Sequence, residues 1–504
     1  MLYAHRGAAY WTDGRERRLF LGTLDGRLFA VDASTGKPVE AFGNGGSIDL
    51  REGVADAFPA AGYGMTSPPA IYQNLVICGA WVSDSLPRGP SGDVRAFDTR
   101  TGKLVWRFHT VPRPGEFGHD TWGGDSWKDR GGTNMWSIAS VDAERGLVFL
   151  PLTSPSPDYY GGDRPGANLF GDSLVALDAV TGRRRWHFQT VHHNIWDYDL
   201  PAQPNLVTVR RAGAEVPAVA QVTKTGFTFV FDRRDGKPLF DIEERPVPAS
   251  PVPGEKTWPT QPFPVKPPPF ARQSMRREEL TDVTPESRAF CEELIRDAEF
   301  GPLYTPIGLK PTVLFPGTNG GANWGGASFD PRTGALYVNS MDVGMISYMA
   351  GRGDPPKVFG RRALDTPNAR FWDKKLNPCQ KPPWAHLTAI DLNTGEFRWR
   401  VVLGVVDELL ERGLPPTGTS NLGGSIVTAG GLVFIGATND SRFRAFDKDT
   451  GEELWVTRLP ASAHATPMTF RGPRSGRQFV VIAAGGGNKY NKVFSDALVA
   501  FALE

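Results

Sequence analysis

The fold of this chain is decided by the stretch LVALDAVTGRRRW at residues 174–186. Its first residues are apolar and indicate a strand, and the segment that ends at Trp186 indicates a second strand. Between them, Asp178 can close a tight turn through a side-chain hydrogen bond to the backbone, and Gly182 can supply a positive φ. The ring of Trp186 then packs the second strand against a neighbour. The stretch therefore predicts one strand–turn–strand unit.

The same A-x-D-x-x-T-G pattern recurs along the chain, and four of its five copies carry tryptophan four residues after the glycine. The other copies lie at residues 28–39, 94–106, 387–399 and 443–455, with looser copies at 140–149, 230–240 and 328–338. One aspartate leads each unit, at positions 32, 98, 142, 178, 232, 330, 391 and 447, with a typical spacing of 36–66 residues. Units of this length fit the four-stranded antiparallel blades of a β-propeller. Unrelated hairpins in sandwiches are the alternative, but the T-G-x-x-x-W signature is too regular for them.

Two segments interrupt the repeat and are expected to be insertions. The first, residues 245–310, opens with a proline-rich run (245–273) that we expect to be extended but not a central strand. A short helix should follow, because Thr284 precedes Pro-Glu-Ser and the later apolar spacing is helical. The second insertion covers residues 350–383. We therefore interpret residues 1–504 as a single all-β propeller domain with long loop and helix insertions.

Composition and charge exclude several classes of protein. The chain has 504 residues, a net charge of +1 and no basic stripe, so neither nucleic acid nor an anionic membrane surface is an expected partner. The 58 glycines and 43 prolines favour short strands and tight turns over a helical bundle. No apolar run reaches the ~18 residues of a membrane span, and the N-terminus does not resemble a signal peptide. The sequence leaves open whether the protein is cytoplasmic or lacks its leader here.

The three cysteines form no CxxC or CxxCH pair, so neither a zinc knuckle nor a covalently attached c-type haem is expected. Cys78 lies in the apolar segment LVICGAW and is expected to be a buried small side chain. Cys291 and Cys379 flank irregular segments and can form a disulfide if the chain is exported. The sequence leaves that pairing open.

The stretch VHHNIWDYDL at residues 191–200 holds more chemistry than folding requires. Asp197 is a candidate proton acceptor, and its alternative interpretation is a turn-closing aspartate. His192 and His193 are either catalytic or, more simply, satisfied polar residues at the end of a strand. Trp196 is expected to be structural.

Together, the repeat and this stretch resemble the pyrroloquinoline quinone (PQQ)-dependent dehydrogenases, especially the catalytic domain of the membrane-bound glucose dehydrogenase type, which includes quinate and polyol dehydrogenases. The resemblance covers nearly the whole chain. Its motifs are HRGAAYW (5–11), GYGMTSPPAI (62–71), PSGDVRAFDTRTG (90–102), QTVHHNIWDYDLPAQPNL (189–206), VTKTGFTFVFDRRDGKP (222–238), LFPGTNGGANWGG (314–326) and GGSIVTAGGLVFIGATND (423–440). The resemblance implies an eight-bladed propeller that binds PQQ on its axis beside a divalent cation. It also implies oxidation of an alcohol or sugar hydroxyl by hydride transfer to PQQ.

The resemblance assigns catalytic roles to two residues. Asp197 matches the general base that accepts the hydroxyl proton. Lys224, in VTKTG, matches the cation beside the reactive quinone oxygens, where it favours the charge that develops on reduction.

The resemblance also assigns metal ligands, namely Asp84, Asn168 and Asp197. Calcium, which prefers oxygen ligands, is expected rather than magnesium or a lanthanide. Relatives usually carry asparagine after the residue equivalent to Asp84; here Ser85 follows, which leaves the exact ligand set open.

PQQ has three carboxylates and a flat ring, so it needs cationic and hydroxyl partners at its rim and flat surfaces above and below. The positions that match the rim are Arg6, Thr66, Thr133, Asn134, Asn323 and Trp324. Tyr159 or Tyr160 is expected to lie against the ring, where relatives place tryptophan.

The chain also departs from the family pattern, because it begins almost at the HRG motif. We therefore expect it to be truncated or short at its N-terminus, with an incomplete N-terminal blade. The resemblance implies a periplasmic protein that passes electrons to an external quinone or cytochrome. Two other functions stay open: a non-enzymatic scaffold like the outer-membrane assembly lipoproteins, which share the repeat, and a calcium-dependent hydrolase.

Overall fold

The computed structural model describes residues 7–353, 356, 358–366, 370–487 and 491–502, and strands dominate it. Among these residues there are two α-helices, α1 (Pro285–Leu294) and α2 (Asp407–Glu411), and two 3-10 helices, η1 (His119–Thr121) and η2 (Arg277–Glu279). The all-β prediction is therefore confirmed.

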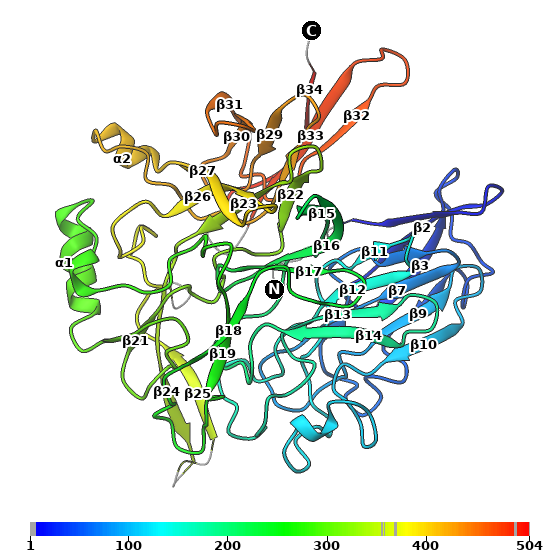
Figure 1. The fold of residues 1–504 in the computed structure, drawn as a ribbon, viewed down its shortest axis with the longest axis horizontal. Helices are drawn as coiled ribbons and strands as arrows, with labels where there is room; N and C mark the ends of the chain where they lie inside the picture. Colours follow the sequence, from blue (N-terminus) through cyan, green and yellow to red (C-terminus); the bar gives the residue numbers. More distant parts are fainter. Residues whose placement is uncertain (1–6, 354–355, 357, 367–369, 488–490, 503–504) are drawn as a thin grey trace.

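Seven sheets follow one another in chain order within the described residues (Figure 1). The first sheet contains β1 (Ala9–Thr12), β2 (Arg17–Gly22), β3 (Arg27–Asp32) and β4 (Ser47–Asp49), and the second contains β6 (Ala70–Tyr72), β7 (Leu75–Cys78), β9 (Val94–Asp98) and β10 (Leu104–Phe108). The third sheet contains β11 (Ser140–Asp142), β12 (Leu147–Pro151), β13 (Ser173–Asp178) and β14 (Arg184–Gln189), and the fourth contains β15 (Asn205–Arg211), β16 (Ala214–Val222) and β17 (Thr228–Asp232). The fifth sheet contains β22 (Ala327–Asp330), β23 (Ala335–Met341), β26 (Ala385–Asp391) and β27 (Glu396–Val402). The sixth contains β28 (Ser425–Val427), β29 (Leu432–Ile435), β30 (Arg442–Asp447) and β31 (Glu453–Arg458), and the seventh contains β32 (Met468–Arg471), β33 (Gln478–Gly486) and β34 (Phe494–Ala502).

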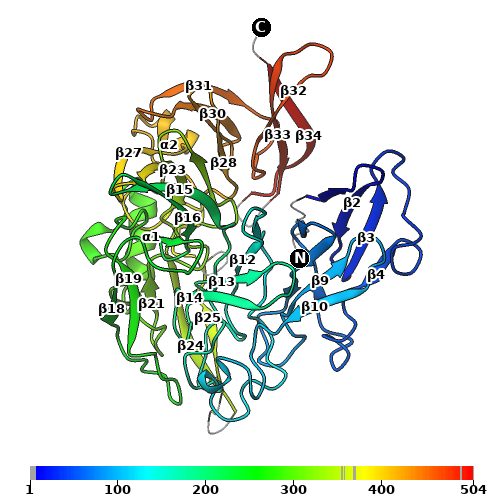
Figure 2. The ribbon, with the colours of Figure 1, turned by 45° about the vertical axis from the view of Figure 1, so that its right-hand side comes forward.

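The first strands of successive sheets contact one another, in the order β1, β6, β11, β15, β22 and β28. This is the arrangement of propeller blades, whose innermost strands surround the axis. The sheets at the two ends of the row, β1–β4 and β32–β34, stand apart in Figure 2. The predicted blade architecture is thus present, whereas the predicted count of eight blades is not confirmed.

The tryptophan of the repeat links three of the described blades to the next one, through Trp106, Trp186 and Trp399. The indole of Trp106 donates a hydrogen bond to the carbonyl of Ala179 at 3.1 Å, and that of Trp186 donates to the carbonyl of Arg233 at 3.0 Å. Each acceptor directly follows an aspartate that leads a repeat unit of the next blade. A Cβ added at Gly182, which has a φ of 69°, would come within 2.6 Å of the Trp106 ring. The T-G-x-x-x-W signature is therefore a docking motif between blades.

The insertions form their own elements at one side of the propeller. The insertions and the residues that flank them form two sheets: β18 (Ile242–Pro246) paired with β19 (Thr260–Pro264), and the sheet of β20 (Glu299–Phe300), β21 (Thr312–Leu314), β24 (Met345–Arg352) and β25 (Val358–Ala363). A further short pair is β5 (Tyr63–Gly64) with β8 (Trp81–Val82). The hydroxyl of Thr284 caps α1 by accepting from the backbone of Ser287, as predicted.

A disulfide joins Cys291 of α1 to Cys379, so it ties the first insertion to the second. It settles the pairing that the sequence left open. Cys78 is a buried free thiol, as expected.

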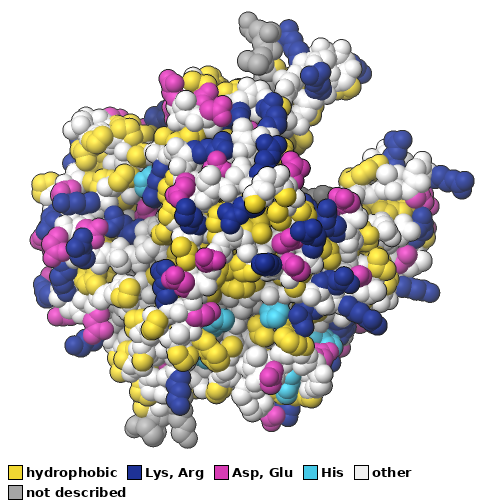
Figure 3. Space-filling view, in the orientation of Figure 1, with side chains coloured by type: hydrophobic (Ala, Val, Ile, Leu, Met, Phe, Trp, Pro, Cys, Tyr) yellow, Lys and Arg dark blue, Asp and Glu magenta, His cyan; other side chains and the backbone are white. Residues whose placement is uncertain are grey.

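The surface carries charges of both signs. Basic and acidic side chains are interspersed over the face shown in Figure 3. Among the described residues, no helix has the length and apolar character needed to cross a membrane.

Candidate active site

The stretch VHHNIWDYDL forms the loop after β14, and two of its aromatic residues anchor it. The Trp196 indole donates to the carbonyl of Thr305 at 2.9 Å, and the Tyr198 hydroxyl donates to the carbonyl of Pro316 at 2.6 Å. Both rings are buried in the apolar cluster around this loop. With its two neighbours held in this way, Asp197 is fixed with a φ of 60°. Trp196 is thus structural, as expected.

Lys224 brings together the two carboxylates of the loop. It lies in the turn between β16 and β17, and its Nζ is 2.8 Å from Oδ1 of Asp197 and 3.3 Å from Oδ2 of Asp199. The same Nζ donates to the carbonyl oxygen of Asp197 at 2.7 Å. The structure therefore places both residues that the resemblance assigned to catalysis in direct contact.

The two carboxylates differ in proton affinity. Burial raises the pKa of Asp197 to about 7, although the charge of Lys224 opposes this effect. Burial also opposes ionisation of Asp199, but there Lys224 and several hydrogen bonds outweigh it and hold the pKa below its ordinary value. Burial acts against the charge of Lys224, yet the two carboxylates raise its pKa. Asp199 therefore stays ionised and balances the charge of Lys224, whereas Asp197 can exchange a proton near neutral pH.

Hydrogen bonds from other loops of the sheet β11–β14 hold Asp199 in place. The Trp136 indole donates to its Oδ2 at 3.2 Å, and the Ser154 hydroxyl lies 3.1 Å from its Oδ1. The same hydroxyl is 3.0 Å from Oδ1 of Asp172. Burial, and then the charge of Asp199, raise the pKa of Asp172 well above its ordinary value. Asp199 is thus held in one position by a network of buried hydrogen bonds.

Tyr159 completes the surroundings of Asp197, since its hydroxyl donates to Oδ2 at 3.1 Å. The resemblance left open whether Tyr159 or Tyr160 faces the cofactor. Tyr160 instead reaches toward the carbonyl of Pro253 and packs against Phe359, inside the insertions. Of the two tyrosines, Tyr159 is therefore the one at the centre.

Sequence reasoning missed Asp158, a carboxylate beside this centre. It is 8% exposed and forms no hydrogen bond in the described part of the chain. Burial, followed by the charges of Asp197 and Asp84, raises its pKa well above the ordinary value. Its signal in the sequence was an acidic residue directly before the two tyrosines, in S-P-D-Y-Y.

Two of the residues predicted at the cofactor rim, Thr133 and Asn134, are buried side by side in the chain. Asn134 is buried and internally paired, because its Nδ2 donates to Ala80 and its Oδ1 accepts from Thr153. Thr133 is fully buried, and its hydroxyl has no hydrogen-bond partner among the described residues. Arg6 lies outside the described residues.

Thr66 and Asn323, two further residues predicted at the rim, form hydrogen bonds with backbone groups of nearby residues. The Thr66 hydroxyl donates to the carbonyl of Trp136 at 3.0 Å. The Asn323 amide donates to the carbonyl of Asn319 at 2.7 Å and accepts from the backbone of Trp324 at 2.8 Å.

The three predicted metal ligands are placed differently. Asp197 is central, and Asp84 is exposed but close enough to act on Asp158. Asn168 is buried, and its Oδ1 accepts from the guanidinium of Arg164 at 2.8 Å. Among the described residues, no group of three or more His, Cys, Asp or Glu side chains is arranged to hold a metal ion.

The first insertion is bonded to the loop through the two histidines. His193 Nε2 lies 3.1 Å from Oε1 of Glu255, and both side chains are nearly fully buried. His192 lies 3.1 Å from Glu244 and 2.7 Å from Gln189. Both histidines therefore have partners away from Asp197, which supports their structural interpretation.

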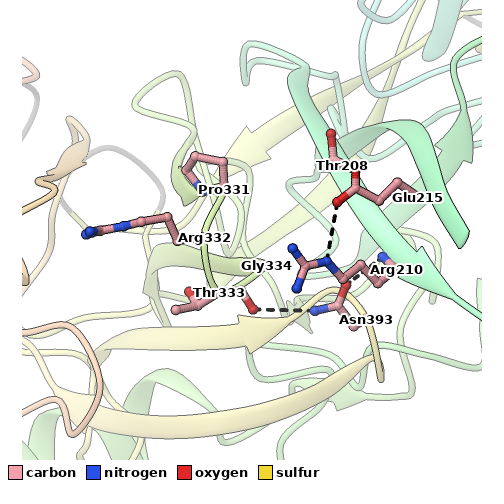
Figure 4. Close-up of a pocket in the computed structure, with 8 residues that line it drawn as sticks. All are labelled: Thr208, Arg210, Glu215, Pro331, Arg332, Thr333, Gly334 and Asn393. Atoms are coloured by element: carbon pink, nitrogen blue, oxygen red, sulfur yellow. Dashed lines mark hydrogen bonds and ion pairs between the residues drawn. The ribbon is translucent and has the colours of Figure 1, made fainter. Parts of the chain in front are cut away.

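Another cavity lies far from this chemistry. It has a volume of about 170 Å³ and is formed by turns of two neighbouring blades, with Arg210, Glu215 and Asn393 in its wall (Figure 4). Arg210 and Glu215 form an ion pair at 3.4 Å. None of the predicted site residues lines this cavity.

The comparisons with known proteins agree on one family. The model of the PQQ glucose/ethanol/alcohol dehydrogenase β-propeller domain matches residues 2–480. The quinate/shikimate dehydrogenase (quinone) of Acinetobacter baylyi is 37% identical over 97% of this chain, and the glycerol dehydrogenase large subunit of Gluconobacter oxydans is 36% identical over 99%. The chain spans 63% and 72% of the lengths of these two relatives. The structure of the quinohemoprotein alcohol dehydrogenase from Comamonas testosteroni superposes with a TM-score of 0.70, at 25% identity, over 99% of this chain and 66% of that one.

Proposed function

The chain belongs to the PQQ family of glucose/ethanol/alcohol dehydrogenase β-propeller domains, and from this premise we propose that it oxidises a hydroxyl group of a small alcohol, sugar or polyol. Glucose, quinate and other polyols are the candidate substrates. The observation that carries the proposal is the contact of Asp197 with Lys224, two residues that lie 27 positions apart in the sequence.

Asp197 is the proposed general base. The pKa of about 7 lets its carboxylate accept the hydroxyl proton of a substrate near neutral pH. Lys224 and Tyr159 each bind one carboxylate oxygen, which fixes the direction from which the proton arrives. Lys224 stays charged throughout, because Asp199 remains ionised beside it. Bound PQQ would supply the acceptor of the hydride, which carries both electrons of the oxidation.

The residues present fit a flat cofactor that carries carboxylates. The hydroxyl of Thr133 is buried without a hydrogen-bond partner within the described residues, and so is Nε of Arg370. Such orphaned groups are unfavourable unless a bound molecule satisfies them. We propose that Thr133, Arg370 and the predicted rim residues Arg6, Thr66, Asn134, Asn323 and Trp324 hold PQQ, with Tyr159 nearest to its ring.

The acids also fit a hard cation. Asp84, Asp158, Asp197 and Asp199 place four carboxyl groups around the single cation of Lys224, and their mutual repulsion contributes to the raised pKa of Asp158, which a cation would relieve. Asp158 has no hydrogen-bond partner in the described part of the chain. We propose calcium, held by oxygen atoms of Asp84, Asp197 and Asn168, with the cofactor completing the ligand set. Asn168 would have to release Arg164 to serve as a ligand.

We further propose that the protein works in the periplasm and passes electrons to an external quinone or cytochrome. The disulfide between Cys291 and Cys379 supports an oxidising compartment.

The test is reconstitution. Purified protein is loaded with PQQ and Ca²⁺ and mixed with an artificial electron-accepting dye, and dye reduction is followed with glucose, quinate, glycerol and ethanol. Reduction with any of them supports the dehydrogenase. Bound PQQ with no reduction would favour the non-enzymatic scaffold, and hydrolysis of a test ester would favour the hydrolase.

A further inference from the structure

The second insertion places a charged side chain over the active site. The guanidinium of Arg361, on β25, lies over the ring of Tyr159, with 4.3 Å from its Cζ to the ring centroid. Among the described residues, the Arg361 side chain makes one hydrogen bond, a weak one from Nη1 to the sulfur of Met345 at 3.7 Å. Arg361 is half-buried, and no carboxylate of the described residues forms an ion pair with it. A charge in such a position favours an anion from outside the chain.

Tyr159 connects this charge to the proposed base. Its ring lies beneath Arg361, and its hydroxyl donates to Oδ2 of Asp197 at 3.1 Å. A molecule lying along Tyr159 would therefore present an anionic group to Arg361 and a hydroxyl to Asp197. The planar fork of a guanidinium matches the two oxygens of a carboxylate, which makes a carboxylate the favoured anion.

Arg370 in the same insertion is a useful contrast. It is 5% exposed, and its guanidinium donates to Thr318 and Asn319 within the motif LFPGTNGGANWGG. Arg370 is thus anchored to a segment that we propose to face the cofactor. Arg361 has no such anchor and is accessible to solvent, so it is suited to a ligand that comes and goes.

We infer that Arg361 binds a carboxylate of the substrate, so that the substrate class is a polyhydroxy acid such as quinate rather than a neutral sugar. This inference rests on the proposed dehydrogenase function and specifies its substrate. The charge comes from the insertion rather than from the blades, so the insertion decides which hydroxyl compound is selected.

The test compares quinate with its uncharged methyl ester. Protein loaded with PQQ and Ca²⁺ is assayed for dye reduction, and binding of both compounds to the same protein is measured by calorimetry. The variants are Arg361→Met, which removes the charge but keeps most of the side-chain length, Arg361→Lys, and the control Arg362→Met at the exposed neighbouring residue. PQQ affinity is measured for each variant by titration.

We expect Arg361→Met to weaken quinate binding and to lower kcat/KM for quinate on the order of 10- to 100-fold, the loss typical of a charged hydrogen bond. Values for the methyl ester, PQQ affinity and the Arg362→Met control should change little, and Arg361→Lys should recover part of the loss. An equal loss with both compounds would show that Arg361 only supports Tyr159, and a loss of PQQ affinity would assign it to the cofactor; either result overturns the inference.

The two proposals fail in different ways. If the wild type oxidises glycerol or glucose but neither binds nor oxidises quinate, the carboxylate site is wrong and the dehydrogenase stands. If quinate binds through Arg361 but no hydroxyl compound reduces the dye, the carboxylate site stands and the dehydrogenase is wrong.

Discussion

Asp197 is the residue on which the proposed chemistry depends. Both of its oxygens are already engaged, Oδ1 by Lys224 and Oδ2 by Tyr159. Replacing it with asparagine keeps the size of the side chain but removes the proton acceptor. Asp197→Asn should therefore lower kcat by about 10²- to 10⁴-fold, the usual contribution of a general base. PQQ binding, measured by titration, should be retained; a variant with wild-type turnover would exclude Asp197 as the base.

Lys224 has a different role at the residue scale, because it supplies a positive charge and accepts no proton. Lys224→Ala leaves Asp197 and Asp199 facing each other without their shared cation. We expect kcat to fall by about 10²- to 10³-fold, as when one electrostatic donor is removed from an active site. The fall in PQQ affinity should be smaller. Stopped-flow reduction and a cofactor titration separate the two effects, and a loss confined to cofactor affinity would contradict the proposed role.

At the scale of elements, Glu255 connects the first insertion to the active-site loop. Burial opposes its charge, but His193 and the backbone of Gly161 outweigh that effect and hold the pKa of Glu255 below its ordinary value of 4.5. Its stabilising contribution is therefore present above pH 4.5 and is lost as the pH falls through the folded-state pKa. Glu255→Gln should lower the free energy of unfolding by about 1–3 kcal/mol at neutral pH.

The difference in unfolding free energy between wild type and Glu255→Gln should shrink as the pH falls from 4.5 through the lowered folded-state pKa, because the folded wild-type carboxyl becomes neutral only below that pKa. Denaturant melts at several pH values measure this difference. A difference that is independent of pH would mean that the charge of Glu255, held by His193 and the backbone of Gly161, does not stabilise the fold.

The docking of tryptophan between blades is also a property of elements. Gly182→Ala would force a Cβ against the Trp106 ring, whereas Gly36, in the first copy of the repeat, has a similar φ of 71° and nothing within 4 Å of an added Cβ. Both substitutions strain the backbone, but only Gly182→Ala also disturbs a blade contact. We expect Gly182→Ala to destabilise by about 1–3 kcal/mol more than Gly36→Ala. Equal losses in thermal unfolding would show that the ring contact contributes nothing.

For the whole molecule, the disulfide joins insertions that are 88 residues apart in sequence. One of them carries Glu255 and the other carries Arg361, so the covalent link holds together two parts that act on the active site. Cys379→Ser should lower the free energy of unfolding by about 2–4 kcal/mol. Calorimetry with and without reductant provides the measurement: reductant should lower the melting temperature of the wild type but leave the variant unchanged.

The sequence by itself determined the blade repeat and the position of the helix after Thr284, and its resemblance to a known family assigned Asp197 and Lys224 to one site. The blade units were readable because each turn is closed locally, as when Oδ1 of Asp178 accepts from Thr181 three residues later. Such short-range bonds leave a periodic pattern in the chain. The assignment of Asp197 and Lys224 to one site was possible because both lie in long motifs that resemble a known family, whereas their direct contact came from the structure.

Tertiary structure alone decided which other groups meet at the centre. It selected Tyr159 over Tyr160, brought Asp158 beside Asp197, engaged Asn168 with Arg164 and placed Arg361 over the site. The insertions have no repeat, and their contacts join residues that lie far apart in the chain, such as Arg361 and Tyr159. Whether a buried polar atom is paired or left for a ligand depends on packing in three dimensions, which no spacing in the sequence encodes.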